Sequence, residues 1–223
     1  METPQKPQKL SYGECRNFLS EIAESGSHVQ LNPEKHLVVA SRDATVLWEI
    51  RLPLPFPAIY DRDQSLNEYL KTVPEEIPTY MTVLVQAGAA ALGYFEEGEV
   101  VLHKAIKKYM KRHSQGKSQI NYLKTRGKSK AGSRIRLANT ITFFEEINER
   151  LTEWEDEFSP QRILYSCTAT LWGLLFQSKI PPPFEKKDSR LIKIPRDVQI
   201  PDFEELLRIN RLSVAGWLTK AEI

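Results

Sequence analysis

The sequence lacks acidic residues over one long stretch, residues 104–136, although the whole chain contains 29 Asp and Glu. The same stretch contains 12 of the 31 Lys and Arg, so the rest of the chain has 19 basic residues against 29 acidic ones. Positive charge concentrated in this way repels itself unless counter-charge comes from outside, and a phosphate backbone is the usual source. The stretch therefore predicts an RNA-binding segment; the alternative is a solvated basic surface without a partner.

Cysteine and histidine are also scarce, and their positions predict no metal or redox site. Cys15 and Cys167 are far apart and the four histidines form no ligand spacing, so we expect reduced thiols and no cofactor. The longest apolar run, residues 81–95, is interrupted by polar residues and glycines and is unsuited to a membrane span. The first ten residues lack an apolar signal region, so we expect a cytoplasmic protein without a membrane partner.

Recognisable catalytic motifs are absent as well. No carboxylate lies in the basic stretch, which argues against a metal-dependent nuclease. The sequence has neither a Gly-X-Ser-X-Gly nucleophile motif nor a glycine-rich P-loop. Any chemistry at the basic stretch would have to use positioned water, backbone donors and an amide side chain.

The hydrophobic periodicity predicts an α+β (mixed α/β) fold, in which helices cover one central sheet that begins with an antiparallel three-strand meander. A Glu97-Gly98 pair lies between the second and third strands of the meander, where a hairpin turn requires positive φ. The expected strands cover residues 36–41, 45–51, 81–87, 89–95, 99–106, 162–167 and 190–194. The expected helices cover residues 11–24, 61–73, 133–154, 168–177 and 202–211.

Prolines and charge suggest the division of the chain into parts. Residues 1–10 are expected to be a flexible tail, and residues 11–75 a subdomain that begins with a helix and a β-hairpin. Pro74 and Pro78 mark the boundary to a larger domain at 79–223. Within it, residues 107–132 contain few apolar side chains, so we expect a mobile basic loop; a loop without function is the alternative.

The helix expected at 133–154 carries its charges against its own dipole. Basic residues precede and begin it, and acidic residues end it, although the dipole favours the opposite arrangement by up to about 1 kcal/mol per charge. Free N–H groups make a helix N-terminus an anion site, so this arrangement suits phosphate contact. The apolar face of the helix is expected to contain Leu137, Ile141, Phe144, Ile147, Leu151 and Trp154.

Two segments carry a family resemblance, VLVQAGAAALGYFEEGEVVLHKAIKKYMKRHSQGKSQ at 83–119 and KAGSRIRLANTITFFEEINERL at 130–151. They resemble the release-factor-like peptidyl-tRNA hydrolases, which include the Vms-like release factors of ribosome quality control and their bacterial relatives. The resemblance covers most of residues 11–214. It implies a catalytic domain at 79–223 with the fold of the middle domain of the eukaryotic class-one release factor.

The resemblance also implies a site. The family typically shows Gly-Gly-Ser-Gln in its loop, and the matching positions here are Gly116, Lys117, Ser118 and Gln119, with Lys117 in place of the second glycine. Gln119 is then the implied catalytic glutamine, and Gly116 and Ser118 keep its approach small. The residues expected to contact RNA phosphates are Lys107, Lys108, Lys111, Arg112, Lys117, Lys124, Arg126, Lys128, Lys130, Arg134 and Arg136.

The function implied by the resemblance is release of nascent peptide from tRNA during ribosome rescue. The implied partners are the rRNA of the large ribosomal subunit and peptidyl-tRNA, with a monomeric protein and no cofactor. The alternative is a non-catalytic ribosome-binding factor on the same fold. Lys117 favours that alternative, because glycine adopts backbone conformations that lysine does not reach easily, whereas Ser118-Gln119 favours the enzyme.

Overall fold

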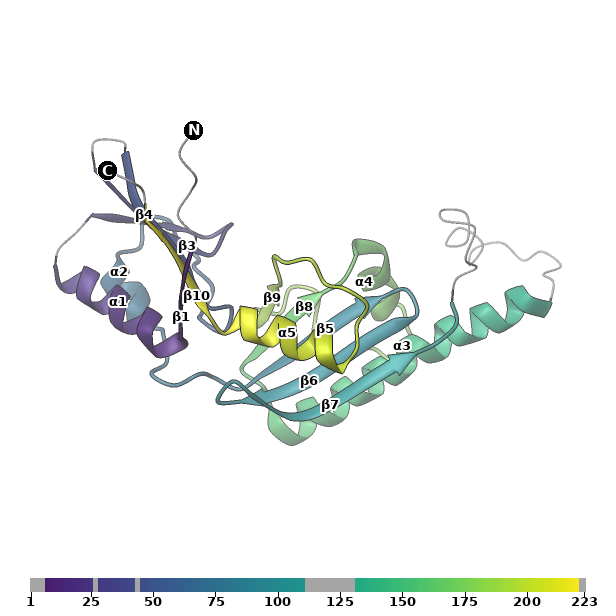
Figure 1. Ribbon diagram of the computed structural model, residues 1–223. Helices are drawn as coiled ribbons and strands as arrows, with labels where there is room; N and C mark the ends of the chain where they lie inside the picture. The colour runs from purple at the N-terminus through teal and green to yellow at the C-terminus, as the bar shows by residue number, and fades with distance from the viewer. Residues whose placement is uncertain (1–6, 26–27, 43–44, 111–130, 221–223) are drawn as a thin grey trace. The chain divides into compact units, whose positions relative to one another are not determined.

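A computed structural model describes residues 7–25, 28–42, 45–110 and 131–220, with the backbone alone at 42 and 131–137. The chain forms two compact units (Figure 1). Unit 1 contains residues 1–80, 96–99 and 208–223, and unit 2 contains residues 81–95 and 100–207. In the described part of the chain, no helix is long and apolar enough to cross a membrane.

Unit 1 is built on a five-stranded sheet in the order β1-β10-β4-β3-β2 with antiparallel neighbours. Its strands are β1 (Gln8–Leu10), β2 (Val29–Asn32), β3 (Leu37–Arg42), β4 (Thr45–Arg51) and β10 (Gly216–Lys220). Two helices, α1 (Tyr12–Glu24) and α2 (Leu66–Leu70), each begin with a capping box. Their apolar sides and the sheet form a core that includes Leu19, Ile50, Phe56 and Tyr69.

Unit 1 differs from the sequence prediction in three strands. β1 lies in the segment expected to be a tail, and β2 and β10 lie where no strand was expected. The expectation of one central sheet is therefore wrong, because the described residues form two five-stranded sheets. Cys15 is buried and free, as expected, and burial raises the pKa of its thiol to about 12.

Unit 2 contains the meander that the sequence predicts. The second sheet has the order β7-β6-β5-β8-β9, with β5 (Tyr80–Gln86), β6 (Ala89–Glu96), β7 (Glu99–Lys107), β8 (Arg162–Ser166) and β9 (Leu191–Lys193). The turn between β6 and β7 has φ of 51° at Glu97 and 84° at Gly98, which confirms the predicted hairpin turn. β9 pairs with β8 in parallel, so the sheet is mixed and the α+β class is confirmed.

Helices lie on both faces of this sheet (Figure 1). The buried side chains of α3 (Ala131–Phe158) and α4 (Ala169–Phe176) share one core with alternate residues of β5 and β6. Leu206 of α5 (Phe203–Ser213) lies on the opposite face, against Gly93 and close to the ring of Phe95. The sequence pattern therefore located all three helices to within a few residues.

The apolar face of α3 needs one correction. Phe144, Ile147, Leu151 and Trp154 are buried as predicted, but the side chain of Ile141 is 43% exposed. Phe143 is fully buried instead. The N-terminal part of α3 extends beyond the sheet (Figure 1), and among the α3 residues with described side chains, 138–158, contact with the core begins at Phe143. Leu137 lies outside the residues whose side chains are described.

Candidate functional site

Most of the residues predicted to form the site lie outside the described residues. This applies to Gly116, Ser118 and Gln119, and also to the basic residues Lys111, Arg112, Lys117, Lys124, Arg126, Lys128 and Lys130. The predicted mobility of the loop at 107–132 likewise falls mostly on residues 111–130, which are not described. Arg134 and Arg136 lie on the first turns of α3. Only Lys107 and Lys108 have described side chains, so the structure shows the two ends of the basic stretch.

The first end leaves the sheet at a well-anchored point. The backbone N–H of Lys108 donates to the carbonyl of Gly88 at 3.0 Å, one residue past the end of β7. The carbonyl of Tyr109 accepts a hydrogen bond from the side-chain amide of Asn139 at 3.0 Å. Met110 then packs against the core of unit 2. A turn of the sheet and a side chain of α3 thus hold the three residues that lead into the undescribed segment.

Gly88 makes this anchoring possible. Its φ of 86° is a left-handed conformation that side chains other than glycine's adopt at a cost. A Cβ at this position would lie 2.5 Å from the backbone carbonyl oxygen of Lys108, so no side chain fits there without movement of the chain. The turn between β5 and β6 is therefore in direct contact with the residues that follow β7. Residues 108–110 are called the root of the basic stretch below.

Two lysines of the basic stretch have an acidic partner that the sequence analysis missed. The Nζ of Lys108 lies 3.0 Å from one carboxylate oxygen of Glu146, and the Nζ of Lys104 lies 3.8 Å from the other. Glu146 belongs to α3, outside the acid-free window. It follows the core residue Phe143 by three positions, and that helical spacing is the signal that would have placed Glu146 beside the sheet.

The other face of β7 is open to solvent. Val101, Ala105 and Lys107 are exposed and alternate with the partly buried or buried residues of the α3 side. His103 is exposed too, and its ring lies 4.0 Å from the ring of Phe203 in an edge-on arrangement. Lys107 thus presents its charge on the face opposite to Lys104 and Lys108.

Tyr109 is a functional candidate that the sequence analysis did not identify. Its side chain is 60% exposed while its backbone carbonyl is held by Asn139. An exposed aromatic ring beside basic residues is the arrangement on which nucleic-acid bases stack. The signal in the sequence was its place two residues after the exposed Lys107, because this spacing continues the outward-facing alternation of β7 beyond the end of the strand.

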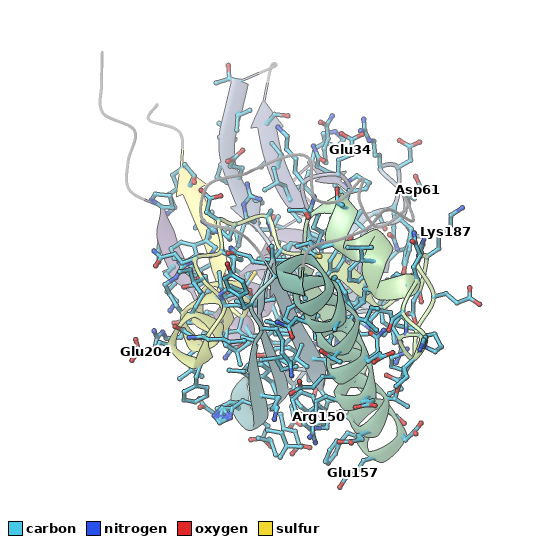
Figure 2. The ribbon with its side chains drawn as sticks, turned by 90° about the vertical axis from the view of Figure 1, so that its right-hand side faces the viewer. Glu34, Asp61, Arg150, Glu157, Lys187 and Glu204 are labelled. Atoms are coloured by element: carbon cyan, nitrogen blue, oxygen red, sulfur yellow. The ribbon has the colours of Figure 1, made fainter. Side chains whose placement is uncertain are left out.

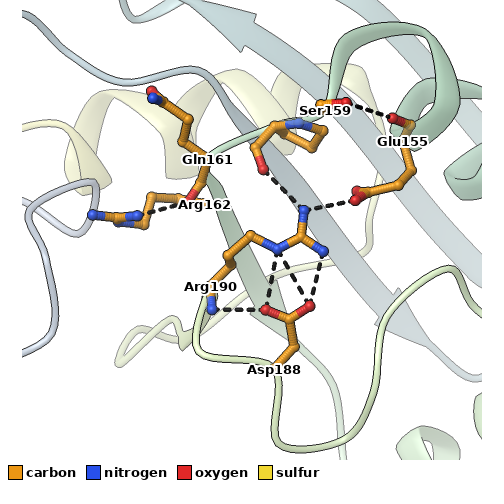
Figure 3. Close-up of polar contacts among 7 residues, drawn as sticks. Glu155, Ser159, Gln161, Arg162, Asp188 and Arg190 are labelled. Carbon is orange, nitrogen blue, oxygen red and sulfur yellow. Dashed lines mark hydrogen bonds and ion pairs between the residues drawn. The ribbon is translucent and has the colours of Figure 1, made fainter.

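The C-terminal half of α3 is fixed from both sides. The side-chain amide of the buried Asn148 donates to the carbonyls of Leu175, at 2.9 Å, and Ile180, at 2.7 Å. Further along, Arg190 joins the helix to the segment before β9: its guanidinium contacts Glu155 at 2.7 Å and Asp188 at 2.8 Å (Figure 3). The hydrogen bonds from Arg190 lower the pKa of the Asp188 carboxyl.

Charge is therefore unequally distributed along α3. Its solvent-facing C-terminal half is mainly acidic, with exposed Glu149, Glu153, Asp156 and Glu157, and Figure 2 shows Arg150 and Glu157 on this half. Its first turns carry Arg134 and Arg136. The contacts of Asn148 and Glu155 fix the C-terminal half of α3. The first turns of the same helix, with Arg134 and Arg136, form the second end of the basic stretch. Among the described residues, no three Cys, His, Asp or Glu side chains form a group that suits a metal ion.

Comparisons with known proteins identify a family over the region of the site. A family model with the description "Bacteroidetes VLRF1 release factor" matches residues 80–215. A solved structure described as "Vms1 mitochondrial localization core" aligns with 95% of this chain and 85% of its own, at 12% identity and a TM-score of 0.48. No curated protein matches the sequence.

Proposed function

This chain belongs to the Bacteroidetes VLRF1 release factor family, and from that membership we propose that it is a ribosome-associated peptidyl-tRNA hydrolase. It frees nascent peptides from tRNA on stalled large ribosomal subunits during ribosome rescue. One observation carries the proposal: the family match over residues 80–215 spans the meander, the whole basic stretch with Gly116–Gln119, and α3. The proposal includes a fold like that of the middle domain of the eukaryotic class-one release factor.

The geometry of the described residues supports this function. A loop that must reach a distant reaction centre requires fixed ends, and the chain is held at Lys108 and Tyr109 before it leaves the sheet. α3 receives the chain again at Ala131, and its C-terminal half is fixed through Asn148 and Glu155. Positive charge at both ends of the stretch would contact rRNA and tRNA phosphates.

The proposed reaction is hydrolysis of the ester that joins the peptide to the 3′-terminal ribose of tRNA. A water molecule attacks the ester carbonyl carbon, the bond between this carbon and the ribose oxygen breaks, and the ribose oxygen takes a proton. The products are a peptide with a free carboxyl group and a tRNA with a free hydroxyl group. The backbone N–H of Gln119 stabilises the developing oxyanion, and its side chain positions the water.

A second function is a non-catalytic ribosome-binding factor, and Lys117 is the observation that favours it. Release by this family relies on a small and adaptable motif, and lysine is restricted at a backbone position where glycine is usual. The two functions differ in the release step and not in binding, so one experiment separates them.

The experiment compares Gln119→Ala with Gln115→Ala, a matched change of another glutamine in the same basic stretch. Each variant is incubated with purified large subunits that carry peptidyl-tRNA, and co-sedimentation and released peptide are measured. We expect all variants to sediment with the subunit and Gln119→Ala alone to release peptide about 100-fold more slowly. A wild-type protein that binds without releasing peptide would establish the binding factor instead, and a wild-type protein that does not bind would refute both functions.

A further inference from the structure

Lys104, Lys108 and Glu146 form a group that the proposed function does not explain. Lys104 and Lys108 lie four residues apart at the end of β7, yet both ammonium groups converge on the carboxylate of one helix residue. They contact different oxygens of Glu146, at 3.8 Å and 3.0 Å. A pair of cations that holds two oxygens of one anion is the arrangement by which proteins hold a phosphate group.

The three side chains are accessible from solvent. Relative exposures are 41% for Lys104, 34% for Lys108 and 34% for Glu146. Ion pairs at such exposure are weak, because water competes with them and ordering the side chains costs entropy. The pairs with Glu146 are therefore readily exchanged for a stronger anion.

We propose that Lys104 and Lys108 form a binding site for an RNA phosphate, which the Glu146 carboxylate occupies in the free protein and from which the phosphate displaces it. The inference rests on the proposed function and adds a contact to it, since Lys104 was not among the residues expected to bind RNA. Glu146 is then an internal competitor: it keeps the two lysines ordered and lowers the affinity of the basic stretch for RNA.

The position of the group makes RNA the favoured ligand over a free anion. The backbone N–H of Lys108 donates a hydrogen bond to the Gly88 carbonyl at the root of the basic stretch, and the exposed Tyr109 is the next residue. Lys104 and Lys108 belong to the same basic stretch that the proposed function places against RNA. A free phosphate ion would gain only two exposed lysines, whereas a polynucleotide adds the neighbouring charges.

The test compares Glu146→Gln with Glu149→Gln, which removes the same charge from an exposed residue one turn along α3. The binding of purified large subunits is titrated at several salt concentrations. We expect Glu146→Gln to bind about two- to tenfold more tightly at low salt, as the loss of an exposed competing ion pair predicts. Its affinity should also fall more steeply with salt, by up to about 0.7 to 0.9 in the log–log slope, because the wild type makes this phosphate contact only in molecules in which the phosphate has displaced Glu146. Glu149→Gln should show only the small effect of net charge.

A third variant, Glu146→Gln with Lys104→Gln, reports on the site itself. The added Lys104 change should remove the gain in affinity and return the salt slope toward that of the wild type. Equal affinities and slopes for Glu146→Gln and Glu149→Gln would overturn the inference and leave Glu146 as a structural ion-pair partner. If the wild type does not bind subunits at all, the proposed function fails first, so the two failures are distinguishable.

Discussion

Gly88→Ala is the sharpest test of how the root of the basic stretch is built. The added Cβ would lie 2.5 Å from the Lys108 carbonyl oxygen, a backbone atom that cannot rotate away. Either β7 moves at its end, or the turn between β5 and β6 changes its conformation. Each movement strains the hydrogen bond from the Lys108 N–H to the Gly88 carbonyl, which is 3.0 Å long.

The expected loss of stability follows from four contributions, of which the fourth is the steric contact itself. A non-glycine residue in the left-handed region costs about 1–2 kcal/mol, and loss of the hydrogen bond costs about 0.5–1.5 kcal/mol. Alanine reduces the freedom of the unfolded chain, which returns about 0.4–1 kcal/mol. Together with the steric contact, we expect unit 2 to lose about 2–3 kcal/mol, or roughly 1–2 M in its urea midpoint.

Urea unfolding measures this loss, and hydrogen exchange of the Lys108 amide measures the root directly. Gly173→Ala is the matched control, since it makes the same change in unit 2, inside α4, where the nearest atom lies 4.0 Å from the new Cβ. There alanine should raise stability by up to about 1 kcal/mol. If Gly88→Ala is as stable as the wild type and its Lys108 amide is equally protected, the contact does not hold the root as described.

Two further changes test how α3 is held. Asn148→Leu removes the donor of one buried and one partly buried hydrogen bond to backbone carbonyl groups and should cost about 2–4 kcal/mol in urea unfolding. A loss below about 1 kcal/mol would show that the amide does not hold the helix. Because Arg190 lowers the pKa of Asp188, this carboxylate stabilises the fold above its unfolded pKa of about 3.9 and loses that effect as pH falls through the folded value. Asp188→Asn should therefore be less stable than the wild type at pH 6 and converge with it as the pH falls. Asp156→Asn, at an exposed site of α3, is the control and should match the wild type in stability at pH 6. A pH-independent difference for Asp188→Asn would contradict the ion pair.

Periodicity predicted the elements that position the site because those elements are set by local signals. Two apolar strands and the Glu97-Gly98 turn predict the meander, and φ at both turn residues is positive. Apolar residues at helical spacing predict α3, and four of them are buried, Phe144, Ile147, Leu151 and Trp154. These signals need no knowledge of distant partners.

The features that the sequence analysis missed depend on distant partners. β1 has three residues, Gln8–Leu10, and is a strand only because β10 pairs with it. Glu146 lies next to Lys104 and Lys108 only because α3 lies along β7. The charges of residues 104–136 alone do not include Glu146, which is ten residues further along the chain. Ile141 has the correct helical spacing for the core but is 43% exposed, and the core instead contains Phe143.

The place of β10 between β1 and β4 has a consequence for the order of folding during synthesis. Both neighbours of β10 are made early, but β10 itself is made only after the whole of unit 2. Unit 2 therefore has all of its strands before the sheet of unit 1 can be completed. Once unit 2 is folded, the chain between β4 and β10 is no longer a long flexible loop. The entropic cost of closing that loop, when β10 pairs with β4, is therefore lower. The sheet of the unit that begins the chain is thus the last to be completed.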